Sequence, residues 1–179
     1  AMNAYIYFNS TYSSLTKYGF VGFAGDYGGD GHTGLAHMLD KDGLASPWTY
    51  LPNTWEFNVT TAIEGIVANQ LEVVMLATGP TQTAEIVGGV AQAGLSPKWI
   101  ALAPAYNDAF VAPDFALKDL MESSMYVTAW GAPYSYDSIG HAKMRAALTA
   151  SGVDSTSSFL VAGWMSQYGL ESALSLIHI

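Results

Sequence analysis

The stretch FVGFAGDYGGDGHTGL, from Phe20 to Leu35, decides the fold because it joins an apolar run to a helical pattern through a glycine-rich turn. The run over 18–24 is rich in aromatic and β-branched residues and predicts a strand. The pattern after it predicts a helix over about 31–41, which ends where Gly43 can adopt the left-handed conformation. A strand, a tight turn and a helix form the repeating unit of an α/β protein.

The same unit repeats along the chain. After an opening helix near 4–15, helices are predicted over 59–69, 81–93 and about 116–121, and strands over 48–51, 71–77, 98–103 and 124–130. The run LEVVMLA at 71–77 is almost continuously apolar, as expected of a strand that is covered on both faces. The helix predicted over 59–69 begins at a capping motif, in which the cap is either Asn58 or Thr60. The predicted fold is α/β, a doubly wound parallel sheet with right-handed crossovers.

The pattern changes beyond the last predicted strand. The sequence GAPYSYD at 131–137 contains Gly131 and Pro133 and is a candidate crossing between two domains. Two helices are predicted after it, over 139–150 and 157–173, with no strand between them. The first residues of the chain show no signal peptide and run directly into the fold. We therefore expect the lobe to be incomplete at both ends.

The last residues, LSLIHI at 174–179, have a different expected origin. They match the translation of a transposase adapter end that is used in DNA library preparation, so we expect a non-native tail. The alternative is a genuine apolar end of a strand or helix.

Composition excludes several classes of function. The chain of 179 residues is 50% hydrophobic, which is enough to fill a core. Its 15 acidic and 6 basic residues give a net charge of −9 without a basic patch, so no nucleic-acid partner is expected. The sequence has no cysteine, which removes disulfides, thiolate nucleophiles and cysteine-ligated zinc. No apolar run is long enough to span a bilayer.

The glycine-rich turn raises the question of a nucleotide. Gly29, Gly31 and Gly34 match G-x-G-x-x-G, a pattern of dinucleotide-binding loops. However, Gly29 follows the predicted strand too late to hold a pyrophosphate, and Asp26 and Asp30 flank it. A repulsion between unit charges about 4 Å apart costs about 1 kcal/mol in water and about 4 kcal/mol at an effective dielectric constant of about 20. We therefore expect no cofactor, and a nucleotide-dependent enzyme is the least favoured alternative.

Residues for nucleophilic or metal-assisted catalysis are not evident in the sequence. It contains no G-x-S-x-G motif. His32 and His37 are spaced so that they do not share one helix face as metal ligands. The DKDG sequence at 40–43 lacks the later bidentate glutamate of a calcium loop. We expect no catalytic residue, no metal site and no enzyme activity.

Residues that follow three of the predicted strands are candidates for ligand binding. Tyr27 stands after the first strand, Gly79 after the third, and Tyr106 and Asp108 after the fourth. The carboxyl ends of parallel strands share one edge of a sheet, where open α/β proteins bind their ligands. The alternative is that the two tyrosines are half-buried residues at the rim of the fold.

Four segments together resemble a known family: KYGFVGFAGDYGGDGHTGL at 17–35, VVMLATGPTQTAEIVGGVAQAGLSPKWIALAP at 73–104, YVTAWGAPYSYDSIGHAKMRAAL at 126–148 and SQYGLESAL at 166–174. They are similar to the second half of type I periplasmic substrate-binding proteins, in the leucine/isoleucine/valine-binding branch. The resemblance implies two α/β lobes that close on a small solute, without a cofactor, and deliver it to an ABC permease. It implies that residues 1–130 form the C-terminal ligand-binding lobe, and that 131–173 form the hinge crossing and helices of the missing N-terminal lobe.

The resemblance also implies roles for individual residues. Tyr27 matches the tyrosine that lines the cleft, and Gly79 falls where many relatives carry an aromatic residue. Ala103 falls where relatives usually supply an acid to the ligand's ammonium group. Either Asp108 reaches in from a shifted loop, or the ligand has no ammonium group. The turn at 131–133 matches the hinge crossing, although its glycine and proline are equally common in a plain loop.

The resemblance thus implies the substrate-binding component of an ABC importer that captures a small solute, a branched-chain or related amino acid. The implied location is the periplasm or the extracellular face of the cell membrane, with or without a lipid anchor. An extracellular sensor domain of a receptor is the alternative from the signalling class. The expected partners are the small-molecule ligand, the permease and the missing N-terminal lobe.

Overall fold

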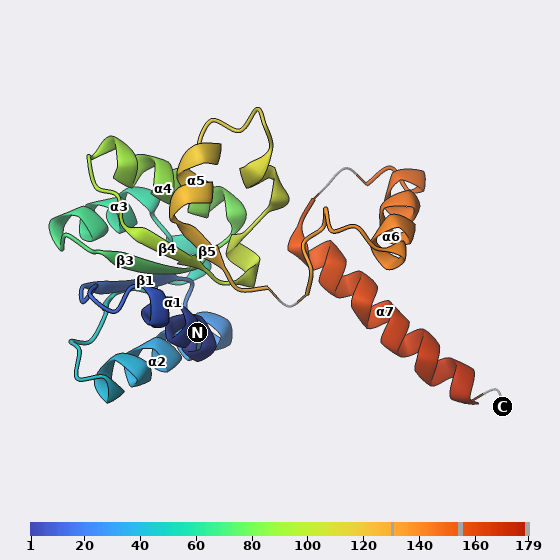
Figure 1. Cartoon of the computed structure of the whole chain (residues 1–179), viewed down its shortest axis with the longest axis horizontal. Coiled ribbons are helices and arrows are strands. Elements are labelled where there is room, and N and C mark those ends of the chain that lie inside the picture. Colours follow the sequence, from blue (N-terminus) through green and yellow to red (C-terminus); the bar gives the residue numbers. More distant parts are fainter. Residues whose placement is uncertain (130, 154–155, 178–179) are drawn as a thin grey trace.

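The computed structural model describes residues 1–129, 131–153 and 156–177 (Figure 1). Its core is a five-stranded sheet in the order β2-β1-β3-β4-β5, in which all neighbouring strands are parallel. The strands are β1 at Tyr18–Gly22, β2 at Trp48–Tyr50, β3 at Val73–Ala77, β4 at Lys98–Ala101 and β5 at Met125–Val127. β3 pairs with β1 along its whole length and with β4 on its other side.

Helices cover both faces of the sheet. One face carries α1 (Met2–Thr11) and α2 (Asp26–Lys41), and the other carries α3 (Val59–Ala68), α4 (Pro80–Gln92) and α5 (Lys118–Ser124) (Figure 1). Alternate side chains of β3 supply the two cores: Val73 and Met75 pack in the α1–α2 layer. Val74 and Leu76 pack with α3 and α4. The predicted α/β fold with a doubly wound parallel sheet is confirmed.

The strand order changes direction at β1. After β1 the chain moves to β2 on one side, and after β2 it crosses back to β3 on the other side of β1. α2, which follows β1, packs on one face, and α4, which follows β3, packs on the opposite face. This arrangement makes the carboxyl ends of β1 and β3 the switch point of the sheet, the place where open α/β proteins bind ligands.

Several predicted caps are confirmed. Asn58 rather than Thr60 caps α3, because its side chain accepts a hydrogen bond from the Thr61 N–H at 3.1 Å. Gly43 and Gly94 have φ angles of +71° and +83°, the left-handed conformation that glycine commonly adopts after a helix.

The predicted start of the second helix was wrong. α2 begins at Asp26 instead of near residue 31, although glycine-rich sequences favour loops. Gly25 precedes the helix with a φ of +114°, and Gly28 lies so close to the carbonyl oxygen of Phe23 that any side chain would collide with it. Tyr27 therefore lies in the first turn of a helix, not in a loop. α1 also ends earlier than predicted, at Thr11.

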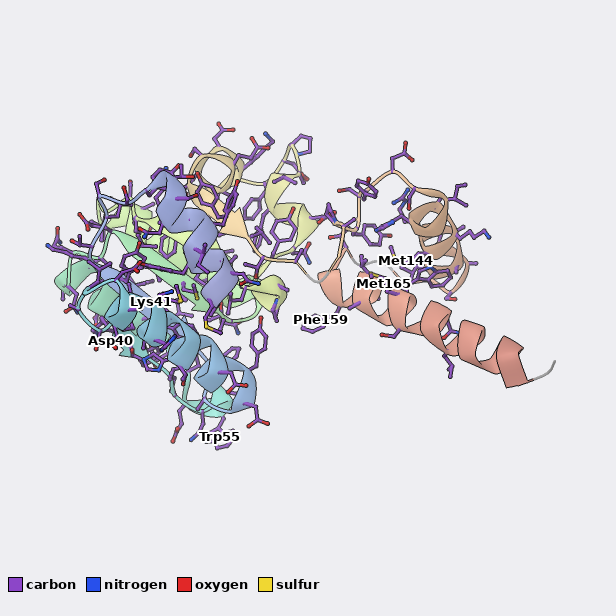
Figure 2. The ribbon with its side chains drawn as sticks, turned by 60° about the horizontal axis from the view of Figure 1, so that its bottom comes forward. Asp40, Lys41, Trp55, Met144, Phe159 and Met165 are labelled. Carbon is purple, nitrogen blue, oxygen red and sulfur yellow. The ribbon has the colours of Figure 1, made fainter. Side chains whose placement is uncertain are left out.

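A segment after β5 connects the sheet to two further helices, α6 at Ile139–Ala150 and α7 at Ser158–Ile177. The pair lies beside the sheet and covers neither face (Figure 1). Met144 of α6 is buried, whereas Phe159 and Met165 of α7 are 54% and 50% exposed (Figure 2). Exposed apolar surface of this kind is typical of an interaction site.

Two predicted features fall partly outside the described residues. The strand predicted over 124–130 is the shorter β5, and Trp130 is not among the described residues. The helix predicted over 157–173 extends to Ile177, so the first part of the expected tail is helical and 178–179 lie outside the described part. None of the described helices is long and apolar enough to cross a membrane.

Two glycines of α2 allow a matched test of the turn. We expect Gly28→Ala to lower the free energy of unfolding by about 2 kcal/mol or more, because its Cβ would collide with a backbone oxygen. Gly29→Ala is the control, since nothing lies within 4 Å of the place its Cβ would take. Alanine is the better helix former there, by up to about 1 kcal/mol. Urea denaturation measures both changes, and equal stabilities would contradict the packing of this turn.

Hydrogen exchange tests whether α6 and α7 are stable without another partner. We expect their amides to exchange at least about tenfold faster than those of α4, because α7 leaves large apolar side chains exposed while Ile86, Val87 and Val90 of α4 are fully buried. Mass spectrometry of the 179-residue chain measures the three helices together. Equal protection would show that the helical pair needs no further packing.

Candidate ligand-binding site

The predicted binding residues follow adjacent strands of the sheet. β1 ends at Gly22, β3 at Ala77 and β4 at Ala101. Because these strands are parallel and neighbours, their carboxyl ends lie at one edge. Tyr27, Gly79, Ala103, Tyr106 and Asp108 all come shortly after these ends, so the structure brings them to the same edge.

Tyr27 is available for contact at this edge. Its side chain is 45% exposed in the first turn of α2. Partial burial raises the pKa of Tyr27 to about 12, so its hydroxyl stays protonated at neutral pH. A half-exposed phenol offers both an apolar ring and one hydrogen-bond donor to a ligand.

The absence of a side chain at Gly79 leaves room for the amide side chain of Gln82 at the same edge. It is the residue before α4, whose first residue is Pro80. The side-chain oxygen Oε1 of Gln82 lies 2.7 Å from the place where a Cβ of residue 79 would stand. Gln82 thus fills space that a larger residue at 79 would need. It is a candidate binding residue that sequence reasoning missed, and only its position in the first turn of α4 hinted at it.

The position of the expected acid is apolar. Ala103 lies in the short 3-10 helix Ala103–Ala105 and is 4% exposed, so this position supplies no charge. Tyr106 follows it and is half-buried. Burial, and then the neighbouring charge and hydrogen bond of Asp108, raise the pKa of Tyr106 to about 12. The tyrosine hydroxyl is therefore a stable donor beside the carboxylate.

Asp108 connects the sheet to the crossing segment. It begins the 3-10 helix Asp108–Val111 and is 9% exposed. Its Oδ2 accepts a hydrogen bond from the backbone N–H of Ser135 at 2.7 Å. One oxygen of the only carboxylate predicted near the ligand's ammonium group is thus already engaged within the chain.

Arg145 of α6 holds the crossing segment from the other side. Its Nη1 donates hydrogen bonds to the backbone oxygens of Tyr134 at 2.9 Å and Tyr136 at 3.1 Å. Gly131 packs against α7, because a Cβ there would lie 2.8 Å from the Sδ of Met165. The hinge role of Gly131 and Pro133 stays a prediction.

An apolar hollow adjoins Tyr106. It has a volume of about 340 Å³ and lies between the segment after β4, α5, β5 and the crossing. Its lining is mostly apolar and includes Phe110, Met121, Met125, Val127 and Pro133, together with the carboxylate-bearing Glu122. Ligand pockets of this size are mostly apolar with a few polar groups, which fits an aliphatic or aromatic ligand part.

The glycine-rich stretch forms no phosphate-binding loop. Gly29, Gly31 and Gly34 all lie within α2. Gly31 packs against the sheet, because a Cβ there would lie 2.9 Å from the ring of Phe20. Close packing of helix and sheet therefore explains this glycine of the G-x-G-x-x-G match. Within 1–129, 131–153 and 156–177, no three histidine, aspartate or glutamate side chains gather as a metal site would require.

This architecture is the type I periplasmic binding protein fold, over part of the length of such proteins. A fatty acid ABC transporter substrate-binding protein from Thermomonospora curvata matches with a TM-score of 0.72 at 20% identity, over 91% of this chain and 42% of its own. A leucine binding protein from Thermotoga maritima matches with a TM-score of 0.66 at 11% identity, over 97% and 49%.

A third solved structure is an amino acid ABC transporter substrate-binding protein from Pseudomonas fluorescens. It matches with a TM-score of 0.60 at 11% identity, over 89% of this chain and 42% of its own. At these identities the likeness establishes the fold, and this chain spans less than half of each of the three proteins. No protein-family model and no curated protein matches the sequence.

Substitutions of Asp108 test whether its carboxylate holds the crossing. We expect Asp108→Ala to lower the free energy of unfolding by about 1.5–3 kcal/mol, as the loss of a hydrogen bond to a charged group does. The Ser135 amide should also exchange faster. Asp108→Asn keeps an oxygen acceptor and should cost about 1 kcal/mol or less. Unchanged exchange of the Ser135 amide in Asp108→Ala would show that this bond does not hold the crossing.

Proposed function

We propose that this chain is part of an extracytoplasmic substrate-binding component of an ABC importer. The observation that carries the proposal is that an accessible tyrosine, Tyr27, and a glutamine amide, Gln82, follow β1 and β3 at the switch-point edge, while Tyr106 follows the neighbouring β4 beside an apolar hollow. The structural neighbours support it, because they are binding proteins for a fatty acid, for leucine and for amino acids. They are not enzymes, which agrees with a binding role.

In this proposal residues 1–130 are the C-terminal lobe, and 131–173 are the crossing and helices of the N-terminal lobe. The separation of α6 and α7 from the sheet supports this division (Figure 1). So do the exposed apolar side chains of that pair, which the rest of the N-terminal lobe would cover. The solute would bind between the lobes, and rotation about the crossing would close them.

The proposed solute is small and largely apolar, a branched-chain or related amino acid. The hollow beside Tyr106 provides apolar surface for its side chain. An ammonium group would need the second oxygen of Asp108, the carboxylate of Glu122 in the lining of the hollow, or an acid of the other lobe, because Ala103 has no charge and Asp108 already accepts the Ser135 N–H. A solute without an ammonium group avoids this requirement, as a fatty acid does.

A sensor role is the second candidate. One structural neighbour, from Verminephrobacter eiseniae, is described as an extracellular ligand-binding receptor, with a TM-score of 0.66 at 10% identity. The same closure would then signal instead of delivering the solute to a permease. Permease and ATPase genes beside the full-length gene would support import, whereas an attached kinase or membrane segment would support sensing.

Calorimetric titration of the protein with both lobes tests the proposed function. We expect leucine, isoleucine or valine to bind, with octanoate as the comparison solute that lacks an ammonium group. The 179-residue chain alone should bind far more weakly, because the contacts of the other lobe are absent. Tight binding by the chain alone would contradict the two-lobe proposal. Asp108→Asn separates the solutes: it should weaken the binding of the amino acids, which carry an ammonium group, and leave the binding of octanoate unchanged.

Tyr27 is the residue to substitute in that titration. We expect Tyr27→Ala to weaken binding by about 2 kcal/mol or more, as the loss of an aromatic anchor does. Tyr27→Phe should cost about 1 kcal/mol, because only the hydrogen bond is lost. Lys41→Ala is the control, since Lys41 is exposed at the end of α2 opposite to Tyr27. Unchanged affinity in Tyr27→Ala would remove Tyr27 from the site.

A further inference from the structure

Among the large apolar side chains whose exposure the structure describes, Trp55 is the most exposed, at 83%. It lies in the short 3-10 helix Thr54–Glu56, which follows β2 at the same carboxyl edge as the candidate site. Figure 2 shows its indole at the bottom of the view, projecting away from the ribbon. Asp40 and Lys41, at the other end of α2, lie well apart from it in that view.

The backbone around Trp55 is fixed on both sides. Before it, the carbonyl oxygen of Pro52 accepts a hydrogen bond from the Ala24 N–H at 2.8 Å. After it, the ring of Phe57 packs against Phe23 with ring centroids 5.0 Å apart. Within the turn, Asn53 Nδ2 donates to Glu56 Oε2 at 2.8 Å. The fold thus presents the indole to solvent from a supported turn.

Trp55 lies at the end of the sheet opposite the crossing. β2 is the outer strand on one side, and β5, which leads into the crossing, is the outer strand on the other. Four strand spacings of about 4.8 Å put about 19 Å between these edges. In a rotation about the crossing, displacement grows with distance from the axis. When the lobes close, the turn that carries Trp55 therefore moves further toward the facing lobe than most of this edge.

The charges around Trp55 define the chemistry of a partner. Asp26 at the start of α2 and Glu56 beside the indole are exposed carboxylates. The basic side chains of the chain lie elsewhere: Lys17, Lys41 and Lys98 near the amino ends of the strands, Lys118 on α5, and Lys143 and Arg145 on α6. An exposed indole attracts a lysine or arginine cation to its face, and neighbouring carboxylates strengthen that attraction.

We propose that Trp55 is the closing contact of this lobe, which docks on lysine or arginine side chains of the facing lobe when the cleft closes. The inference rests on the proposed two-lobe function. It assigns Trp55 to closure and not to the solute, because the candidate binding residues follow β1, β3 and β4, whereas Trp55 follows the outer strand β2.

Crosslinking tests the contact without knowledge of the solute. The chain has no cysteine, so Trp55→Cys creates one site in it for benzophenone maleimide. In the protein with both lobes, irradiation should link residue 55 to a peptide of the facing lobe that contains lysine or arginine. Leucine or octanoate, whichever binds, should raise the yield several-fold. Lys41→Cys, at the amino-end side of the sheet, is the control and should give no such link. Links only to a second copy or a permease, or none at all, would overturn the proposal.

Affinity separates closure from direct solute contact. Trp55→Ala should weaken the binding of leucine, valine and octanoate by the same factor, about tenfold. Trp55→Phe should lose less affinity, because it retains an aromatic face. A change in the ranking of the solutes would mean that Trp55 contacts the solute, which overturns the assignment. If none of the solutes binds even to the unaltered protein, the proposed function fails, and the crosslink alone decides whether Trp55 meets the facing lobe.

Discussion

The pairing of β3 with β1 is the constraint on which the rest of this structure depends. Every residue of β3 is buried, and its alternate side chains supply a core on each face of the sheet. Placing β3 beside β1 rather than beside β2 reverses the strand order at that point. The helices after β1 and β3 then pack on opposite faces, and Tyr27 and Gly79 both follow strands that end at the edge between them.

Local signals made most of the fold predictable. The apolar run of β3, the cap at Asn58 and the left-handed Gly43 and Gly94 each act within a few residues, and each is as predicted. The start of α2 was missed because its cause is not local preference. The glycines of that turn favour a loop in isolation, but they allow the helix to approach the Phe23 carbonyl and the sheet. Tertiary packing decides such a boundary.

The candidate site was predictable in its place and not in its contacts. Repeated β-α units are enough to bring the residues after β1, β3 and β4 to one edge. The hydrogen bond from Ser135 to Asp108 joins segments 27 residues apart, and nothing in either segment identifies its partner. Gln82 was missed for a related reason, since its importance comes from the space above Gly79. Contacts of this kind depend on how separate elements pack.

The crossing is tied to both bodies that it connects. Asp108 binds the Ser135 N–H from the side of the sheet, and Arg145 binds the oxygens of Tyr134 and Tyr136 from α6. Bonds to charged groups are stronger than neutral ones, so they anchor this short segment to the sheet and to α6. A rotation of one body against the other would keep its axis near these residues, on the β5 side. In the proposed two-lobe protein the opposite edge, at β2, would then travel furthest.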